Sequence, residues 1–180
     1  MSMLETDRLA LRLLSTDDAP FMLQLLNDPL WIRFIGDRGV RSLDQARAYI
    51  ENGPIALYER FGFGFYVVEL KPDGVPIGVC SLIKRDFLDA VDLGYALLPS
   101  YAGHGYALEA AAALIGYAAN TLGLTRLVAI VSQDNHRSAR LLEKLGFYYR
   151  EPVQHPGEEA TLMLFVLDSI AKAAATDAST

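Results

Sequence analysis

The chain has 180 residues, of which 52% are hydrophobic, and its formal net charge at pH 7 is −6. This length predicts one domain with a hydrophobic core, and the acidic balance argues against a nucleic-acid partner. The single cysteine, Cys80, cannot form an intrachain disulfide, and no apolar run is long enough to span a membrane. We therefore expect a cytoplasmic domain over residues 1–170, followed by a frayed tail over residues 171–180.

The first half of the chain has the pattern of a strand, two helices and a hairpin. Charged and apolar residues alternate over residues 8–14, which indicates a half-buried strand. Ser15 or Thr16 caps the first helix, and Ser42 caps the second. The turn Lys71-Pro72-Asp73-Gly74 joins two strands in a hairpin. The expected elements are a strand at 8–14, a helix ending at 26, an irregular segment at 30–41, a helix at 43–58, and strands at 63–70 and 76–83.

The second half alternates strands with two helices. An apolar run over residues 91–98 stops at Pro99, which has no N–H for a ladder, so we expect a strand to end there. A long alanine-rich helix is predicted to start near Tyr106 and to end at Gly123. The other expected elements are a strand at 126–131, a helix at 136–145, a strand at 147–150, a polar loop at 153–159 and a strand at 160–167.

Two glycines, Gly103 and Gly105, flank His104 just before the alanine-rich helix. Without a Cβ, they allow a ligand to approach the backbone closely and permit positive φ. The first N–H groups of the helix have no internal partners, and the helix dipole adds partial positive charge. The stretch therefore predicts a phosphate or pyrophosphate site, although the glycines could equally form only a tight turn. It is not a P-loop, because it has no lysine, and Leu108 stands where a dinucleotide fingerprint has its third glycine.

A second constellation begins at Asn135-His136-Arg137-Ser138 and continues through Leu141 to Phe147. Asn135 is placed to cap the short helix, and such a cap is a structural role that needs no ligand. The constellation gains weight because it follows the glycine loop by one helix and one strand.

Five segments, in this order, resemble the GNAT superfamily of N-acetyltransferases, and within it the RimJ/RimL type that acetylates ribosomal-protein N-termini. The resemblance covers nearly the whole chain. It implies an α/β GNAT fold with a mixed, mostly antiparallel central sheet of six to seven strands, flanked by about four helices. Two splayed parallel strands, at 91–98 and 126–131, would form the coenzyme A cleft. The segments are E-T-D-R-L-A-L-R-L-L (5–14), P-I-G-V-C-S-L (76–82), D-L-G-Y-A-L-L-P (92–99), G-H-G-Y-A-L-E-A (103–110) and N-H-R-S-A-R-L-L-E-K-L-G-F (135–147).

The resemblance implies acetyl-CoA as cosubstrate and assigns residues to it. The backbone of Tyr95, Ala96 and Leu97 would pair with pantetheine in the manner of an added strand. Asn135 and Ser138 would contact the pantetheine arm. The N–H groups that would hold the pyrophosphate belong to Gly103, His104, Gly105, Tyr106, Ala107 and Leu108.

The same resemblance implies direct attack of a primary amine on the acetyl thioester. Ser138 matches the serine that the ribosomal type is thought to use as general acid, and an N–H near Tyr95 would stabilise the oxyanion. Asp92 is our first candidate for the general base, although a surface or ladder-edge role would suit it equally well. Two positions depart from the family pattern. Ala102 replaces a glutamine or arginine that contacts phosphate, and Leu142 replaces a tyrosine general acid.

The acceptor would be a primary amine, on either a protein N-terminus or a small molecule. Trp31 and Phe34 are candidate substrate-binding residues, although such aromatics are more often core residues under a loop. The segments at 30–41 and 153–159 would select the acceptor. The three histidines are too scattered to suggest a metal site. A non-catalytic acyl-CoA-binding module is the alternative from another class, and either a monomer or a homodimer is compatible with the sequence.

Overall fold

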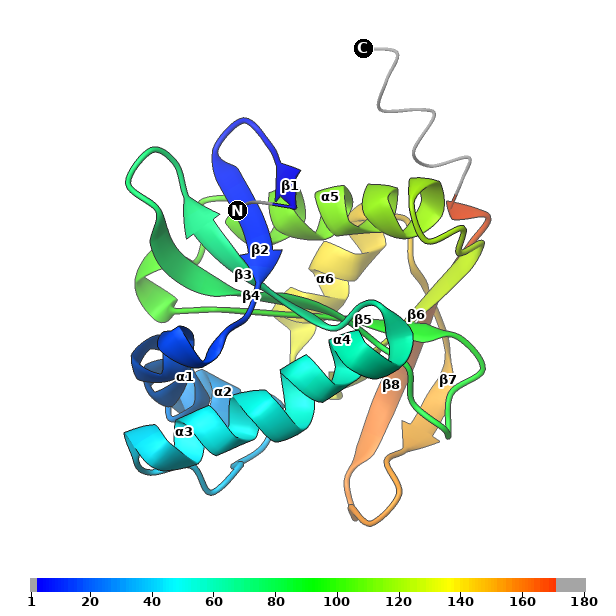
Figure 1. Ribbon diagram of the computed structural model, residues 1–180. Coiled ribbons are helices and arrows are strands. Elements are labelled where there is room, and N and C mark those ends of the chain that lie inside the picture. Colours follow the sequence, from blue (N-terminus) through cyan, green and yellow to red (C-terminus); the bar gives the residue numbers. More distant parts are fainter. Residues whose placement is uncertain (1–2, 171–180) are drawn as a thin grey trace.

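The computed structural model describes residues 3–170, and these build an eight-stranded sheet between two layers of helices (Figure 1). The strands lie in the order β1-β2-β3-β4-β5-β6-β8-β7. All neighbours are antiparallel except β5 and β6, which are parallel. The strands are β1 (Leu4–Glu5), β2 (Leu9–Leu13), β3 (Phe65–Leu70), β4 (Val75–Ile83), β5 (Val91–Leu97), β6 (Arg126–Ser132), β7 (Tyr148–Gln154) and β8 (Thr161–Asp168).

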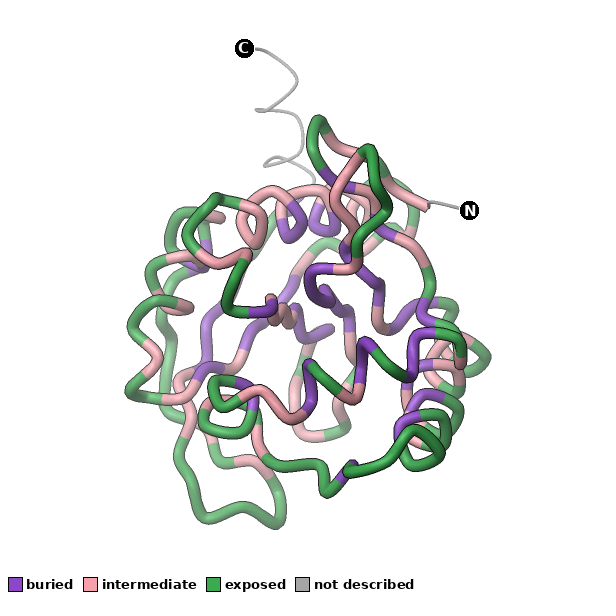
Figure 2. Tube along the Cα trace, turned by 90° about the vertical axis from the view of Figure 1, so that its left-hand side faces the viewer, coloured by how far each residue is buried: buried purple, intermediate pink, exposed green. Residues whose placement is uncertain are grey.

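The helices divide between the two faces of the sheet, and each layer closes a hydrophobic core. One core joins α5 and α6 to the sheet through residues such as Leu114 and Leu142. The other joins α1, α2 and α3 to the opposite face through residues such as Met22 and Ala46. Figure 2 shows the buried residues along the central strands and the inward turns of the helices. The helices are α1 (Ala19–Leu26), α2 (Pro29–Phe34), α3 (Leu43–Ile50), α4 (Ala56–Phe61), α5 (Tyr106–Asn120) and α6 (His136–Lys144).

The predicted fold class is confirmed, with one strand more than expected. The seven strands inferred from periodicity are all present, and the hairpin and its antiparallel neighbours lie as predicted. The additional strand, β1, has two residues and pairs with β2 through Leu4 and Leu11. Two residues are too few to show a period, so the sequence could not indicate it. Residues 171–180, predicted to fray, lie outside the described part of the chain.

The segment predicted to be irregular at 30–41 is instead partly helical. The helix α2 begins at Pro29, and the Asp28 carboxylate accepts a hydrogen bond from the Leu30 N–H at 2.9 Å. Pro29 ends α1 and at the same time opens α2, because proline is well suited to the first turn of a helix. The sequence was interpreted only for the way Pro29 stops the preceding helix, so the six residues of α2 were not predicted to be helical.

Two other boundaries differ from the prediction. The helix that begins at Leu43 continues past Tyr58 to Phe61, through a π-helical turn at Glu51–Ile55. The strand predicted over 147–150 extends to Gln154, because β7 pairs with β8 along its whole length, including two residues assigned to a loop.

The feature that positions the site is the separation of β5 from β6. They pair only at Val91↔Leu127 and Asp92↔Val128. Beyond Asp92, β5 continues with β4 alone, and β6 continues with β8 alone. The sheet therefore opens in a V at its centre, which confirms the predicted pair of splayed parallel strands.

Candidate active site

A cavity of about 980 Å³ occupies the opening between β5 and β6. Both helical layers contribute to its wall. On one face it is lined by α2 and α3, including Trp31, Phe34 and Tyr49, and on the other by the start of α5 and by α6. The cavity therefore passes through the sheet, and two molecules can approach each other from opposite faces.

Part of the β5 backbone faces this opening without a strand partner. The Leu98 N–H donates to the Ile77 carbonyl at 2.8 Å, which fixes the phase of the β4–β5 ladder. Because alternate residues in an antiparallel pair bond to the same neighbour, the amides of Ala96 and Gly94 face β4. Those of Tyr95 and Leu97 then face the gap, where an extended ligand can complete their hydrogen bonds.

The glycine loop lies at the mouth of the same cavity. Gly103 has φ of 83° and Gly105 has φ of 81°, a left-handed conformation that favours glycine. Gly105 immediately precedes α5, so the loop directs the unpaired N–H groups of that helix into the cavity. The lining includes every predicted loop residue except His104, whose ring stacks on Tyr106 with centroids 5.7 Å apart.

Arg8, the residue just before β2, braces the loop, an interaction that the sequence did not reveal. Its guanidinium donates to the His104 carbonyl at 2.9 Å and to the Glu109 carboxylate at 2.7 Å, and it stacks over the Tyr106 ring. Burial opposes the ionisation of Glu109, but hydrogen bonds from Thr6 and Arg8 outweigh it and hold the pKa of Glu109 below its usual value. The loop is thereby fixed to the sheet.

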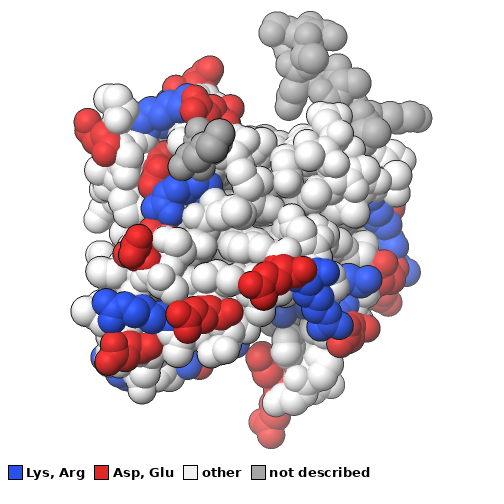
Figure 3. Space-filling view, in the orientation of Figure 1, with Lys and Arg blue, Asp and Glu red and all other residues white. Residues whose placement is uncertain are grey.

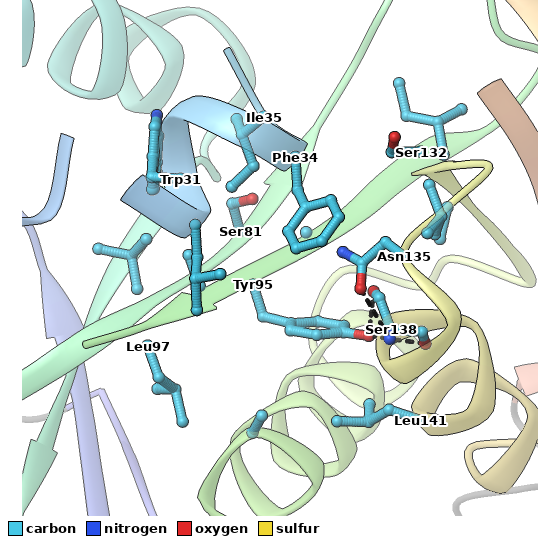
Figure 4. A pocket seen from close by; sticks show the side chains of 18 of the residues that line it. Trp31, Phe34, Ile35, Ser81, Tyr95, Leu97, Ser132, Asn135, Ser138 and Leu141 are labelled. Carbon is cyan, nitrogen blue, oxygen red and sulfur yellow. Dashed lines mark hydrogen bonds between the residues drawn. The ribbon is translucent and has the colours of Figure 1, made fainter. Parts of the chain in front are cut away.

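Asn135, Ser138 and Tyr95 meet on the α6 side of the cavity. The Asn135 side chain accepts a hydrogen bond from the Ser138 N–H at 3.2 Å, so the predicted cap is present. The Ser138 Oγ lies 2.7 Å from the Tyr95 Oη, and Figure 4 shows the Tyr95 ring extending toward it. Burial raises the pKa of Tyr95 to about 12, so the phenol stays neutral at physiological pH.

Asp92 lies at the apex of the V, where β5 and β6 part. Only 3% of it is exposed, and its carboxylate accepts hydrogen bonds from the Arg85 Nε at 2.7 Å and from the Ile130 N–H. Burial raises its pKa to about 6, against the opposing effect of Arg85. A carboxylate with this pKa is mostly ionised at pH 7 and can still accept a proton.

Comparisons with known proteins agree with this geometry. Residues 8–148 match the model of the acetyltransferase (GNAT) domain. The chain belongs to the GNAT family of acetyltransferases. It is 31% identical over 146 residues to the uncharacterized N-acetyltransferase YoaA of Bacillus subtilis, which covers 80% of this chain and 81% of that protein.

Two solved GNAT structures share the fold of this enzyme. RimL, a ribosomal alpha-N-protein acetyltransferase in complex with coenzyme A, superposes with a TM-score of 0.79 and 20% identity, over 92% of this chain and 97% of that one. The spermidine N-acetyltransferase of Vibrio cholerae, in complex with coenzyme A and spermine, superposes with a TM-score of 0.77 and 18% identity, over 93% and 99%. The two act on different amines, so the fold alone does not define the acceptor.

Leu142, which stands where many GNAT enzymes have a tyrosine, is only 1% exposed and packs in the core beneath α6. Its role in the structure is therefore packing, and the source of an acid stays a prediction. The Tyr95 side chain places a phenol beside Ser138 from a different element, although the sequence analysis considered only its backbone. A strand residue and a helix residue 43 positions apart give no local signal for this contact.

The cavity wall of this GNAT enzyme contains residues from both segments predicted to select the acceptor. Trp31 and Phe34 line the cavity, and Trp31 is at the same time a member of the second core. His155 and Glu158, from the β7–β8 connection, reach the same wall. Ser81 and Arg85 also line this wall, and neither carries a signal in the sequence that marks it as a site residue.

Within residues 3–170 no group of three or more histidine, cysteine or acidic side chains is arranged to hold a metal ion. No helix in that range has the length and apolarity to cross a bilayer. On the face drawn in Figure 3, acidic and basic side chains are interspersed, so that face offers no single-sign basic patch for nucleic acid.

Proposed function

We propose that this GNAT enzyme transfers the acetyl group of acetyl-CoA to a primary amine by direct attack in a ternary complex. The observation that carries the proposal is the unpaired edge of β5, at Tyr95 and Leu97, beside the amides at the start of α5. Together they offer hydrogen-bond donors and acceptors for an extended amide chain and donors for a diphosphate. Coenzyme A has both groups in this order.

The residues around the cavity fit this coenzyme. Gly103 and Gly105 leave the loop backbone accessible, and Asn135 uses its side-chain oxygen for the cap, which leaves its amide N–H groups for a pantetheine carbonyl. Acetyl-CoA supplies an activated acyl group whose thiolate has a pKa near 8.5 and leaves readily. The Tyr95 N–H then lies where charge develops on the thioester oxygen, and one such donor contributes roughly 3 kcal/mol in other acyl transferases.

Asp92 and Ser138 supply the proton transfers in this mechanism. Asp92 takes the proton of the incoming ammonium, through water, because its carboxylate lines the cavity on the acceptor face. Ser138 donates a hydrogen bond to the departing sulfur, and its Oγ can recover a proton from the Tyr95 phenol at 2.7 Å. The gain from Ser138 is modest, since the thiolate is already a fair leaving group.

For the acceptor we propose an amine with a single positive charge, such as the α-amine of a polypeptide. The acceptor half of the cavity has Asp28, Asp92 and Glu158 against Arg33, Arg38 and Arg85, so its formal charge balances. A polyamine needs an excess of carboxylates, which this wall does not supply. An α-amine has a pKa near 8, about two units above that of Asp92, whereas a lysine-like amine lies above it by more than four.

Calorimetry and a thiol-release assay test the proposal together. We expect acetyl-CoA to bind the purified protein, and free thiol to appear when peptides with free N-termini are added. Spermidine and N-terminally blocked lysine peptides, tested in parallel, should release less thiol. Absence of acetyl-CoA binding would refute the coenzyme site, whereas faster turnover of spermidine would refute the proposed acceptor.

A further inference from the structure

Ser81, in β4, is a buried polar residue that lines the cavity. The residue as a whole is 4% exposed, and its hydroxyl is not among the buried side-chain polar atoms that lack a partner within residues 3–170, as expected for a group that opens onto the cavity. It lines the cavity, and Figure 4 shows the hydroxyl turned toward the Phe34 side of the pocket. A hydroxyl that faces a cavity can both accept and donate a hydrogen bond, so it is available to a bound ligand.

The strand register places Ser81 near both the proposed general base, Asp92, and the proposed thioester position beside Tyr95. Ser81 is opposite Gly94, and Ile83 is opposite Asp92, so Ser81 and Asp92 are diagonal neighbours on the acceptor face. Diagonal neighbours in an antiparallel pair lie roughly 7–8 Å apart, which lets one water molecule bridge their side chains. Gly94 also directly precedes Tyr95, whose N–H faces the thioester position.

Gly94 makes room for this hydroxyl. A Cβ at position 94 would lie 2.8 Å from the Ser81 Oγ, closer than such atoms approach in proteins. With glycine there, the hydroxyl stands open to the gap between β5 and β6. The glycine opposite Ser81 therefore leaves the serine hydroxyl accessible to a ligand in the gap.

We propose that Ser81 binds the acceptor amine and relays its proton toward Asp92. The ammonium N–H donates to the Ser81 Oγ, and the Ser81 O–H donates to a water molecule that in turn donates to the Asp92 carboxylate. Before the amine attacks, one proton leaves the ammonium nitrogen and one reaches Asp92, while Ser81 ends with the single proton that it had at the start. The second proton, which the nitrogen loses after the attack, passes to the departing thiolate. The inference rests on the proposed acetyl transfer and assigns a residue to its acceptor side.

Other charged groups face Asp92 and are kept constant in the test. Arg85 contacts it from the β4–β5 connection, and His155 acts on it from the β7–β8 connection, where it lies 3.7 Å from Glu158. None of these is changed by a substitution at Ser81, so a difference between variants reports the hydroxyl itself.

The experiment compares the wild type with Ser81→Ala in acetylation of a peptide with a free N-terminus, from pH 6 to pH 9.5. At pH 7 about one in ten α-amines is neutral, so kcat should fall by up to about tenfold, with the KM for acetyl-CoA unchanged. Above the amine pKa of about 8 the two rates should converge, since the amine already binds in its neutral, nucleophilic form and needs no relay before the attack. A purely structural defect would lower the rate by the same factor at every pH.

Two further variants complete the test. Ser81→Ala with Asp92→Asn should lose no more activity than Asp92→Asn alone, because both act on one proton. Gly94→Ala, which displaces the hydroxyl without removing it, should reproduce the pH dependence of Ser81→Ala. Ser132→Ala is the matched control, since Ser132 lines the same cavity but already bonds to Asp134 at 2.8 Å.

The outcomes separate the two proposals. A wild type that binds no acetyl-CoA and releases no thiol overturns the proposed function. An active wild type whose Ser81→Ala variant has equal rates, or a pH-independent loss, overturns the role of Ser81 alone. Because Ser81→Ala removes a hydroxyl that faces the cavity, the unfolding midpoint of the variant should stay close to that of the wild type.

Discussion

Replacing Asp92 with asparagine tests the proposed general base and, by the size of the effect, the acceptor as well. The substitution keeps the shape of the side chain and removes its charge. Asp92 would speed the reaction by converting the bound ammonium to the neutral amine. The largest rate increase that it can provide is therefore the inverse of the fraction of the amine that is already neutral in solution. At pH 7 this gain is about tenfold for an α-amine of pKa 8 and about 2,500-fold for a lysine-like amine of pKa 10.4.

The assay is kcat/KM for a peptide acceptor as a function of pH. In the wild type, kcat/KM should rise through pH 6, where Asp92 ionises, and then level off. In Asp92→Asn the rise should instead follow the amine itself, up to about pH 8. Superimposable profiles for the two proteins would refute the assignment of Asp92 as base. Asp89→Asn is the control, because Asp89 is half exposed and lies outside the cavity lining.

Asp92→Asn should also change how the free energy of unfolding depends on pH. Burial raises the pKa of Asp92 from 3.8 to about 6, so the folded state favours its protonated form. The wild type therefore loses stability as pH rises from about 4 to about 6, by roughly 3 kcal/mol from this group. In Asp92→Asn that slope should be absent from urea unfolding measured across this range. An unchanged slope would show that Asp92 titrates in the folded state as it does in the unfolded chain.

Three further substitutions test the coenzyme side. Gly105→Val should abolish acetyl-CoA binding in calorimetry, because a β-branched residue is strained at φ of 81° and covers the loop amides, whereas Gly116→Ala, with open space at its Cβ, should bind normally. Ser138→Ala should lower kcat severalfold with little change in acetyl-CoA affinity, and equal kcat values would remove Ser138 as the acid. Glu109→Gln should weaken acetyl-CoA binding and lower stability by about 1–2 kcal/mol at pH 7. The lowered pKa of Glu109 means that its ionised form stabilises the fold, so this stability loss should vanish as pH falls below about 4.5 and the carboxylate becomes protonated. A loss of stability that is the same at every pH would contradict the proposed role of the Arg8–Glu109 interaction.

The sequence predicted those parts of the fold that depend on local pattern. Seven strands are long enough to show an alternating pattern or a continuous apolar run, and the hairpin turn is encoded within four residues. The helix α2 was missed because Asp28-Pro29 serves both as a stop and as a start, and a six-residue helix is too short for its periodicity to prevail. In the same way, the glycine loop and the Asn135 cap are local motifs, and their positions agree with the structure.

The rest of the site depends on contacts between distant segments. Arg8 and Glu109 are 101 residues apart, and only the register of β2 beside the start of α5 brings them together. Ser81 acquires its significance from Gly94, which is its partner only because β4 and β5 pair with one particular register. A serine in an apolar strand gives no signal of its own, so these residues could be found only after the pairing was known.

The alternation of side chains along β5 explains why one cavity can serve two substrates. Asp92 and Tyr95 are three positions apart, so their side chains lie on opposite faces of the sheet. Tyr95 meets Ser138 on the face of α5 and α6, where the glycine loop lies, and Asp92 belongs to the face of α2 and α3, beside Ser81. An intact sheet would separate these two groups completely. Because β5 and β6 part just beyond Asp92, an amine on one face can reach a thioester held from the other, and the reaction requires this opening before it requires any single side chain.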